Sequence, residues 1–210
     1  MSFIDEGKLR IHDTIGKFLP MFTAAGKGNI TIGQCLSHTT GIQSGKSFST
    51  LFREKIAGPC EMTNTDFRKA PVPIAAGSAF STPADYLRLL QMIVNNGNYK
   101  GKTVLKKEIV ALMQHNYAKG KKMISSPAEA GTWGYGFGEW TADNSSGTER
   151  SNSVTSPGLF GSFPWIDNKN RYAGVLFTFY IKSNGRHERY TALKKIIDDA
   201  ITGIVPGQKN

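Results

Sequence analysis

The apolar positions of this chain follow a helical period over most of its first 130 residues. The clearest run is "STPADYLRLLQMIVNNGNY", in which Ser81 or Thr82 can cap a helix, Pro83 suits its first turn and Gly97 ends it. A broad apolar face is formed there by Tyr86, Leu87, Leu89, Leu90, Met92 and Ile93. This pattern predicts an amphipathic helix that packs on a core.

Three weaker helical signals surround this run. The spacing of apolar residues predicts a helix over 47–56 and another over 106–114. Near the amino terminus, "HDTIGKFLP" predicts a short helical turn that Pro20 ends. After the helix predicted over 47–56, the segment "GPCEMTNTDF" is typical of turns.

From Trp133 onward the period changes to alternation, which favours strands. "WGYGFGEW" predicts one strand over 133–140, and "LFGSFPWID" and "RYAGVLFTFYI" flank the turn sequence "NKN", which predicts an antiparallel hairpin. A final helix ending at Gly203 is expected to pack on the sheet through Tyr190, Leu193, Ile196, Ile197 and Ile201. No repeat or linker divides the chain, so we expect one domain over 1–210, with a mostly helical portion over 8–130 and the sheet with its helix over 131–210.

The charge balance changes this picture little. The formal net charge is +10, but the densest basic cluster, "YAKGKKM", lies in a loop-like segment, and other lysines fall on the polar faces of predicted helices. We interpret these lysines as solvated and expect no nucleic-acid partner. No run reaches the roughly 18 apolar residues that a membrane span needs, and "MSFIDEGKLR" lacks the pattern of a signal peptide, so we expect no membrane segment and leave the compartment open.

The cysteines and histidines do not form a recognisable metal site. Cys35 and Cys60 lie in no ligand spacing and are too few for a disulfide scaffold, so we interpret both as buried thiols. His12, His115 and His187 occur in polar contexts and are interpreted as surface residues. The sequence therefore predicts no metal and no cofactor.

The pair Ser37–His38 in "IGQCLSHTTGIQSG" raises the possibility of a serine nucleophile with its base. Adjacent side chains on a helix diverge by about 100°, so one is poorly placed to activate the other. We favour a structural role at the turn that includes Gly41. "GYGFG" is not a phosphate loop, because its glycines alternate with aromatic residues and no lysine follows; it suits a strand that passes close to other backbone.

Six segments in order resemble the serine beta-lactamase-like family, which includes class C beta-lactamases, D-alanyl-D-alanine carboxypeptidases and esterases. These segments are "DEGKLRIHDTIGKFLP", "ITIGQCLSHTTGI", "LFREKIAGPCEMTNT", "AAGSAFSTPADYLRLLQMI", "WGYGFG" and "SPGLFGSFPWIDNKNRYAGVLFT". The resemblance implies an α/β fold: an antiparallel sheet with the carboxy-terminal helix packed on it, plus a helical portion. It also implies a small-molecule acyl substrate and explains "LSHTTG" as a structural corner of the family.

The family's catalytic motifs are largely absent. Its nucleophile is the serine of an S-x-x-K helix, assisted by Y-x-N, and neither pattern occurs in these 210 residues. The resemblance therefore implies that the family's amino-terminal elements are missing, and we identify no catalytic residue. Only the third motif, K-T-G or H-x-G, has a counterpart: Ser156, Pro157 and Gly158 take its positions, and Leu159 supplies the backbone N–H of half an oxyanion hole.

These observations lead to two main hypotheses of different classes. In the first, the chain is a serine hydrolase scaffold that is inactive alone; in the second, it is a non-catalytic binding or assembly module on the same scaffold. A hydrolase with a relocated nucleophile is a weaker third hypothesis. For the substrate-binding wall we name Ser156, Gly158 and Leu159, which we expect on a strand at the rim of a pocket. Missing elements would expose apolar core, so we also expect a homo-oligomer.

Overall fold

The computed structural model divides the chain into two compact units, Met1–Lys55 with Asp66–Phe80, and Ile56–Thr65 with Ser81–Asn210. It describes residues 10, 12–18, 20–24, 26–31, 47–67, 78–116, 118–120, 126–136, 138–143, 150–182 and 184–203. The expectation of one domain over 1–210 stays a prediction.

The described part of the first unit contains three short helices. Helix α2 spans Ile15–Phe18 and α3 spans Pro20–Ala24. The predicted short helical turn is α2, which ends before Pro20, and Pro20 begins the next helix, α3; proline suits a first turn because its missing N–H would be unpaired there. Helix α5, Phe48–Phe52, lies within the helix predicted over 47–56, and the Ser47 side chain caps it.

Aromatic contacts hold α5 to a nearby segment of the same unit. Phe48 and Phe52 stack at 6.5 Å between ring centroids, and both meet Phe67 edge-on, at 5.0 and 5.1 Å. Edge-to-face pairs of this kind stabilise a fold beyond the area that they bury. Helix α5 continues directly into the π-helix η2, Arg53–Ala57.

The second unit is built around a five-stranded antiparallel sheet. Its order is β3-β4-β5-β6-β7, with β3 Gly134–Tyr135, β4 Trp140–Thr141, β5 Ser153–Thr155, β6 Phe163–Asp167 and β7 Tyr172–Leu176. The β6–β7 hairpin pairs Phe163 with Leu176 and Asp167 with Tyr172, which confirms the hairpin predicted around "NKN". The short strand β5 was not predicted.

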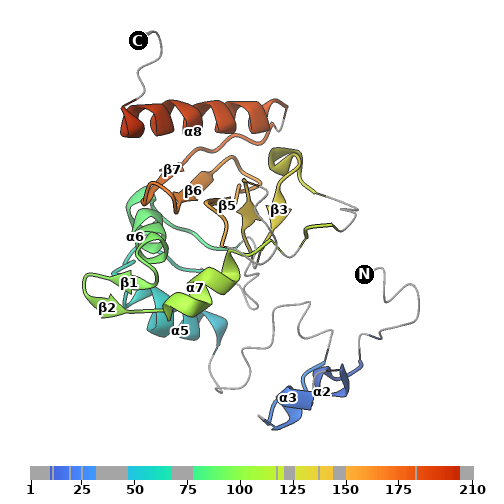
Figure 1. Ribbon diagram of the computed structural model, residues 1–210. Coiled ribbons are helices and arrows are strands. Elements are labelled where there is room, and N and C mark those ends of the chain that lie inside the picture. Colours follow the sequence, from blue (N-terminus) through green and yellow to red (C-terminus); the bar gives the residue numbers. More distant parts are fainter. Residues whose placement is uncertain are drawn as a thin grey trace. The chain divides into compact units, whose positions relative to one another are not determined.

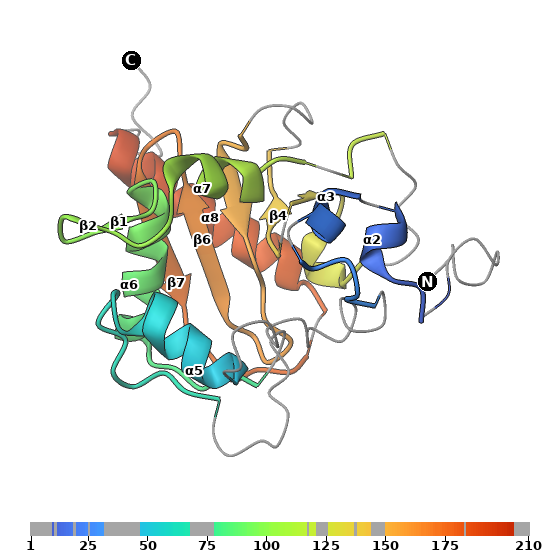
Figure 2. The same cartoon turned by 90° about the horizontal axis from the view of Figure 1, so that it is seen from below.

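Helices lie on both faces of this sheet (Figures 1 and 2). Helix α8, Arg186–Thr202, packs on one face, where Phe163 and Tyr190 stack at 4.2 Å between centroids. Helix α6, Pro83–Val94, packs against β6 and β7. Strand β6 is buried at every residue, as expected of a strand covered on both faces.

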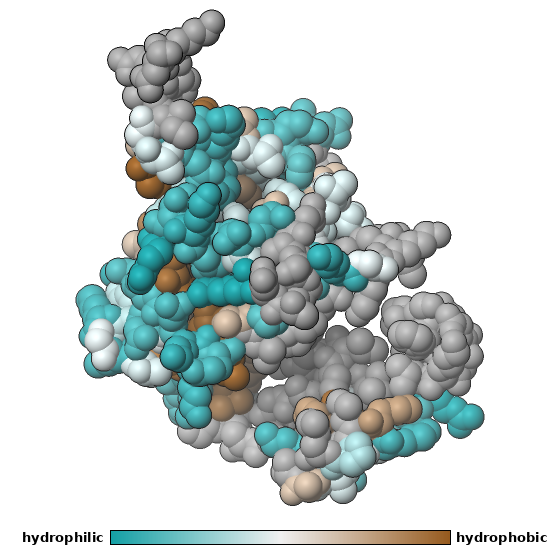
Figure 3. All heavy atoms as spheres, viewed as in Figure 1, coloured by the Kyte–Doolittle hydropathy of each residue, from teal (hydrophilic) through white to brown (hydrophobic). Residues whose placement is uncertain are grey.

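The remaining elements of this unit are short. They are η2 from Ile56, the hairpin β1 Asn98–Tyr99 with β2 Lys102–Thr103, helix α7 Lys107–Met113 and the 3-10 helix η3 Ala128–Ala130. Helix α7 confirms the helix predicted over 106–114, whereas the β1–β2 hairpin was not predicted. Figure 3 shows hydrophilic residues over much of one face, with smaller apolar areas between them.

Helix α6 follows the sequence prediction closely. The Thr82 side chain accepts a hydrogen bond from Asp85 N, and Pro83 is the first helical residue. Leu90, Met92 and Ile93 are buried. A cap, a proline and an apolar face all favour the same helix, so local and tertiary preferences agree.

Two predictions about the sheet region are wrong in detail. Residues 133–140 form two short strands instead of one, because the chain turns at Gly138, whose φ is +79°. On α8, Tyr190 is buried and Leu193 and Ile197 pack on the core, but Ile196 and Ile201 are 63% and 50% exposed. Ile196 lies about 120° around the helix from Tyr190, and so points away from the sheet.

The prediction that the "GYGFG" segment passes close to other backbone is confirmed. A Cβ on Gly136 would collide with the carbonyl oxygen of Met113, and one on Gly134 would collide with the Asn116 side chain. These glycines let β3 lie against the end of α7. Cys60 is a buried free thiol whose pKa is raised to about 11 by burial, as the thiol interpretation predicts.

Candidate functional site

The predicted substrate-binding residues lie together where β5 ends. Ser156, Pro157 and Gly158 follow Thr155, the last residue of β5, and Leu159 begins the turn that leads to β6. The expectation that these residues form part of a strand is therefore wrong. Pro157 lies beyond the β5–β6 ladder, so its missing N–H costs the sheet no hydrogen bond.

Glycines determine the shape of this turn. Gly158 N donates to Ser162 O at 2.8 Å, and Gly161 N donates to Gly158 O at 3.0 Å. A Cβ on Gly158 would collide with the Ser162 hydroxyl, and Gly161 has a φ of +102°, a region that side chains rarely enter. Gly161, with its positive φ and its contact with Tyr180 backbone, is therefore the glycine that the turn requires, whereas the Ser162 hydroxyl beside Gly158 can rotate away.

Arg186 joins this turn to two other segments. Its Nη1 donates to Leu159 O at 3.2 Å and forms an ion pair with Glu129, while its other nitrogens donate to the carbonyls of Tyr180 and Lys182. Only 2% of the Arg186 surface is exposed. The sequence carries no signal for this role, because a single arginine at the start of an amphipathic helix is usually a surface residue.

The chemistry that the segment offers is limited. Ser156 presents an exposed neutral hydroxyl where the family has lysine or histidine, and Leu159 is 77% exposed. A hydroxyl can form a hydrogen bond with a substrate but provides no positive charge for a carboxylate. Nothing in Ser156–Leu159 acts as a general base.

The histidines lie in three different settings. His12 is exposed, as predicted. His187 is half-buried instead: its Nδ1 lies 3.0 Å from Glu129 O and its ring centroid lies 4.9 Å from that of Trp133. His115 is also partly buried, and its backbone forms an isolated antiparallel β-bridge with Arg150. Ser37, His38 and Cys35 fall outside the described residues.

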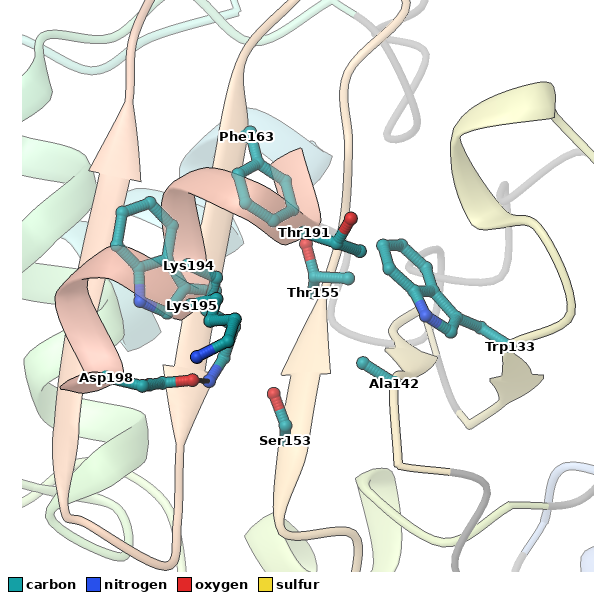
Figure 4. A pocket seen from close by; sticks show the side chains of 10 residues that line it. Trp133, Ala142, Ser153, Thr155, Phe163, Thr191, Lys194, Lys195 and Asp198 are labelled. Atoms are coloured by element: carbon teal, nitrogen blue, oxygen red, sulfur yellow. Dashed lines mark hydrogen bonds and ion pairs between the residues drawn. The ribbon is translucent and has the colours of Figure 1, made fainter. Parts of the chain in front are cut away.

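A cavity of about 210 Å³ lies between α8 and the sheet (Figure 4). Lys194 Nζ binds Asp167 at 2.9 Å and Asp198 at 2.8 Å, and Lys195 pairs with Asp199 at 2.7 Å. Desolvation acts to lower the pKa of Lys194, but its bonds to the two carboxylates outweigh this and raise it. The lysines of this cavity are thus already paired, which makes it a poor site for an acidic substrate.

A partly buried polar cluster lies around Arg150. Its guanidinium donates to Gln114 Oε1 at 2.7 Å, to Asn96 Oδ1 at 2.5 Å and to Asn168 Oδ1 at 2.7 Å. These bonds join the ends of α6 and α7 to the β6–β7 turn. Three neutral acceptors thus bind the partly buried guanidinium, whose charge keeps some contact with solvent.

The positive charge of Arg150 acts on the nearby Glu139 carboxylate. Burial raises the pKa of Glu139 to about 7, against the opposing charge of Arg150. The Gln114 amide also acts to lower this pKa, yet Gln114 Nε2 and Glu139 Oε2 have no hydrogen bond of normal geometry within the described residues. Glu139 is therefore a carboxylate that is easily protonated near neutral pH.

Among the residues that the structure describes, no three histidine, cysteine or acidic side chains group as metal ligands do. Likewise, none of the described helices has the length and apolar character that a membrane span requires.

Comparison with known proteins identifies the family. The Beta-lactamase family matches residues 43–198, and no curated protein matches the chain. A protein from Bacteroides dorei described as a beta-lactamase is 21% identical with a TM-score of 0.68, over 93% of this chain and 79% of its own. A beta-lactamase from Mycobacterium bovis is 19% identical with a TM-score of 0.63, over 80% and 61% of the two chains.

A third solved structure is described as a 6-aminohexanoate-dimer hydrolase from Bacillus anthracis. It is 23% identical with a TM-score of 0.61, over 77% of this chain and 40% of its own. The chain thus spans less than two thirds of the second and third of these structures, and at such identities they show a shared fold. Because the family match covers well over half of the sequence, the chain belongs to the beta-lactamase family.

Proposed function

We propose that this chain is a serine hydrolase scaffold that does not itself form an acyl-enzyme. One observation carries the proposal: the chain has a third-motif segment, Ser156–Gly158, while its 210 residues contain neither S-x-x-K nor Y-x-N. An acyl-enzyme needs a serine that is activated by a nearby base. Without that serine no oxyanion forms, so the remaining backbone donor has no negative charge to stabilise.

The described geometry supports this proposal. The turn after β5 is fixed by Gly158, Gly161 and the Arg186 contact with Leu159 O. Preorganised backbone donors are what an acyl-transfer pocket uses. A rigid turn therefore fits the wall of a pocket for a small acyl compound, such as a beta-lactam, a D-alanyl peptide or an ester, even where hydrolysis is lost.

The second candidate, a binding or assembly module, rests on the apolar residues beside the same turn. Leu159 and Phe179 are 77% and 82% exposed, and Phe160 is 52% exposed. Exposed clusters of large apolar side chains are typical of interaction sites. The two candidates are compatible, because a scaffold that has lost its chemistry can keep or gain a binding role.

Turnover and binding separate these candidates. We expect the purified chain to hydrolyse neither a chromogenic cephalosporin nor p-nitrophenyl esters above the buffer rate, with Ser156→Ala and Ser37→Ala variants as matched controls. Turnover that Ser37→Ala removes would overturn the proposal and favour a relocated nucleophile. Saturable binding of the cephalosporin without turnover, weakened by Ser156→Ala, would support a retained pocket wall; no binding would favour the assembly role.

A further inference from the structure

The dipeptide Asn–Gly occurs twice in the sequence, as Asn96–Gly97 and as Asn184–Gly185. Asparagine before glycine is prone to rearrangement of the main chain, because glycine has no side chain to shield its nitrogen from the preceding amide. The reaction also requires that the glycine nitrogen can move onto the asparagine side chain. Since the two dipeptides share the same local chemistry, their surroundings in the fold decide which one reacts.

The first dipeptide is held on both sides of the reacting bond. Gly97 is buried, its N donates to Met92 O at 2.9 Å, and its carbonyl oxygen accepts a bond from Leu105 N at 3.1 Å. The Asn96 side chain is also engaged, because its Oδ1 accepts a bond from Arg150 Nη1 at 2.5 Å. Rearrangement at Asn96 therefore requires local opening of this turn.

The second dipeptide forms the turn that leads into α8. Asn184 and Gly185 are both exposed, and Gly185 precedes the helix in the left-handed conformation, with a φ of +65°. Its carbonyl oxygen accepts a bond from Arg189 N at 3.2 Å. Among the residues that the structure describes, neither Gly185 N nor the Asn184 side chain has a hydrogen-bond partner. These two groups can thus approach each other without breaking a described bond.

We propose that Asn184 is a site of spontaneous deamidation in the folded chain. Gly185 N attacks Asn184 Cγ, and the new N–Cγ bond closes a five-membered succinimide. The bond from Cγ to Nδ2 breaks, and Nδ2 leaves as ammonia with the proton from Gly185 N. Water then opens the ring: cleavage at Cγ gives aspartate, and cleavage at the main-chain carbonyl gives isoaspartate, whose main chain runs through Cβ and Cγ.

Isoaspartate at this position lengthens the main chain just before Arg186. Arg186 Nε donates to Lys182 O at 3.0 Å, so this bond closes a ring of atoms that contains the Asn184–Gly185 link. The same guanidinium donates to Leu159 O and pairs with Glu129. An added methylene in the ring therefore strains the link that holds the turn after β5, whether or not the chain hydrolyses a substrate.

Mass spectrometry of the ageing chain tests the site. The folded chain is kept at mildly alkaline pH, which favours loss of the proton from the attacking nitrogen. Digestion after lysine then places Asn184 in peptide 183–194 and Asn96 in peptide 70–100. We expect Asn184 to convert at least about tenfold faster than Asn96, because only Asn96 requires local opening.

The same measurement in concentrated urea separates structure from sequence. Both dipeptides are exposed in the unfolded chain, so their rates should agree within about twofold. Equal rates in the folded chain, or a tenfold ratio that urea leaves unchanged, would overturn the proposal.

Urea unfolding of aged samples tests the consequence for Arg186. We expect aged wild type to show a second transition at lower urea, whose amplitude follows the isoaspartate fraction. Asn184→Gln should lack it, because the longer side chain would have to close a six-membered ring, whereas the exposed control Asn152→Gln should age like the wild type. Asn184→Asp adds the charge without lengthening the chain and should keep the original midpoint. An equal second transition in Asn184→Gln, or a lowered midpoint in Asn184→Asp, would contradict the proposed strain.

Discussion

Arg186 at the start of α8 and Glu129 in η3 form an ion pair in which the two residues are only 2% and 7% exposed. The same guanidinium holds the carbonyl oxygens of Leu159, Tyr180 and Lys182. One side chain thus links the turn after β5, the segment after β7 and the 3-10 helix before β3. This link fixes the candidate pocket wall in place.

Removing this arginine is expected to destabilise the fold strongly. Arg186→Met would leave the Glu129 carboxylate buried without its partner, at a cost of about 3–5 kcal/mol. The matched control is Lys195→Met on the same helix, whose pair with Asp199 is 72% exposed on the lysine side and should change stability by less than about 0.5 kcal/mol. Urea unfolding measures both; a loss below about 1 kcal/mol for Arg186→Met would contradict the structural role.

Glu139 is expected to make stability depend on pH. Its folded pKa of about 7 lies above its ordinary value of 4.5, so between these values the folded state holds a proton that the unfolded state releases. Its contribution is therefore full below about pH 4.5 and is lost as the pH rises through 7, a change on the order of 3 kcal/mol.

Glu139→Gln should flatten this part of the pH profile, as measured by urea unfolding from pH 4.5 to 8. Glu108→Gln is the control, because the Glu108 side chain is 67% exposed on α7. If the wild type and Glu139→Gln lose stability in parallel over this range, the buried carboxylate is not the cause.

Gly174 is expected to tolerate no side chain. A Cβ there would collide with the Trp165 indole across the β6–β7 ladder, so Gly174→Ala should cost about 1–3 kcal/mol through overpacking. In a Trp165→Leu background the same change should cost less, because the ring is gone. Additive costs in the double variant would show that ring contact is not the reason for glycine.

Elements with several agreeing local signals could be predicted from the sequence. Helix α6 has a cap, a proline and an apolar face, and the β6–β7 hairpin has apolar runs around a polar turn. The split of residues 133–140 into β3 and β4 could not be predicted, because alternation continues through the turn and only the φ of Gly138 reveals it. Strand β5 was missed because three residues are too short for a periodic signal.

The candidate site was predictable only as a stretch of sequence. Ser156, Gly158 and Leu159 do lie together, but their position beyond the strand end depends on the turn formed by Gly158 and Gly161. The role of Arg186 depends on contacts with residues 27 and 57 positions away, which no local pattern encodes. The desolvation of Glu139, close to Gln114 and Arg150, likewise comes from the tertiary fold.

The central claim is that this chain lacks an activated serine, and intact mass spectrometry tests it most directly. After incubation with a beta-lactam or a fluorophosphonate, we expect the mass of the unmodified chain, because no serine has a lysine one helical turn on. A stoichiometric adduct would contradict the account, and its mapping to Ser37 would identify the Ser37–His38 pair as catalytic.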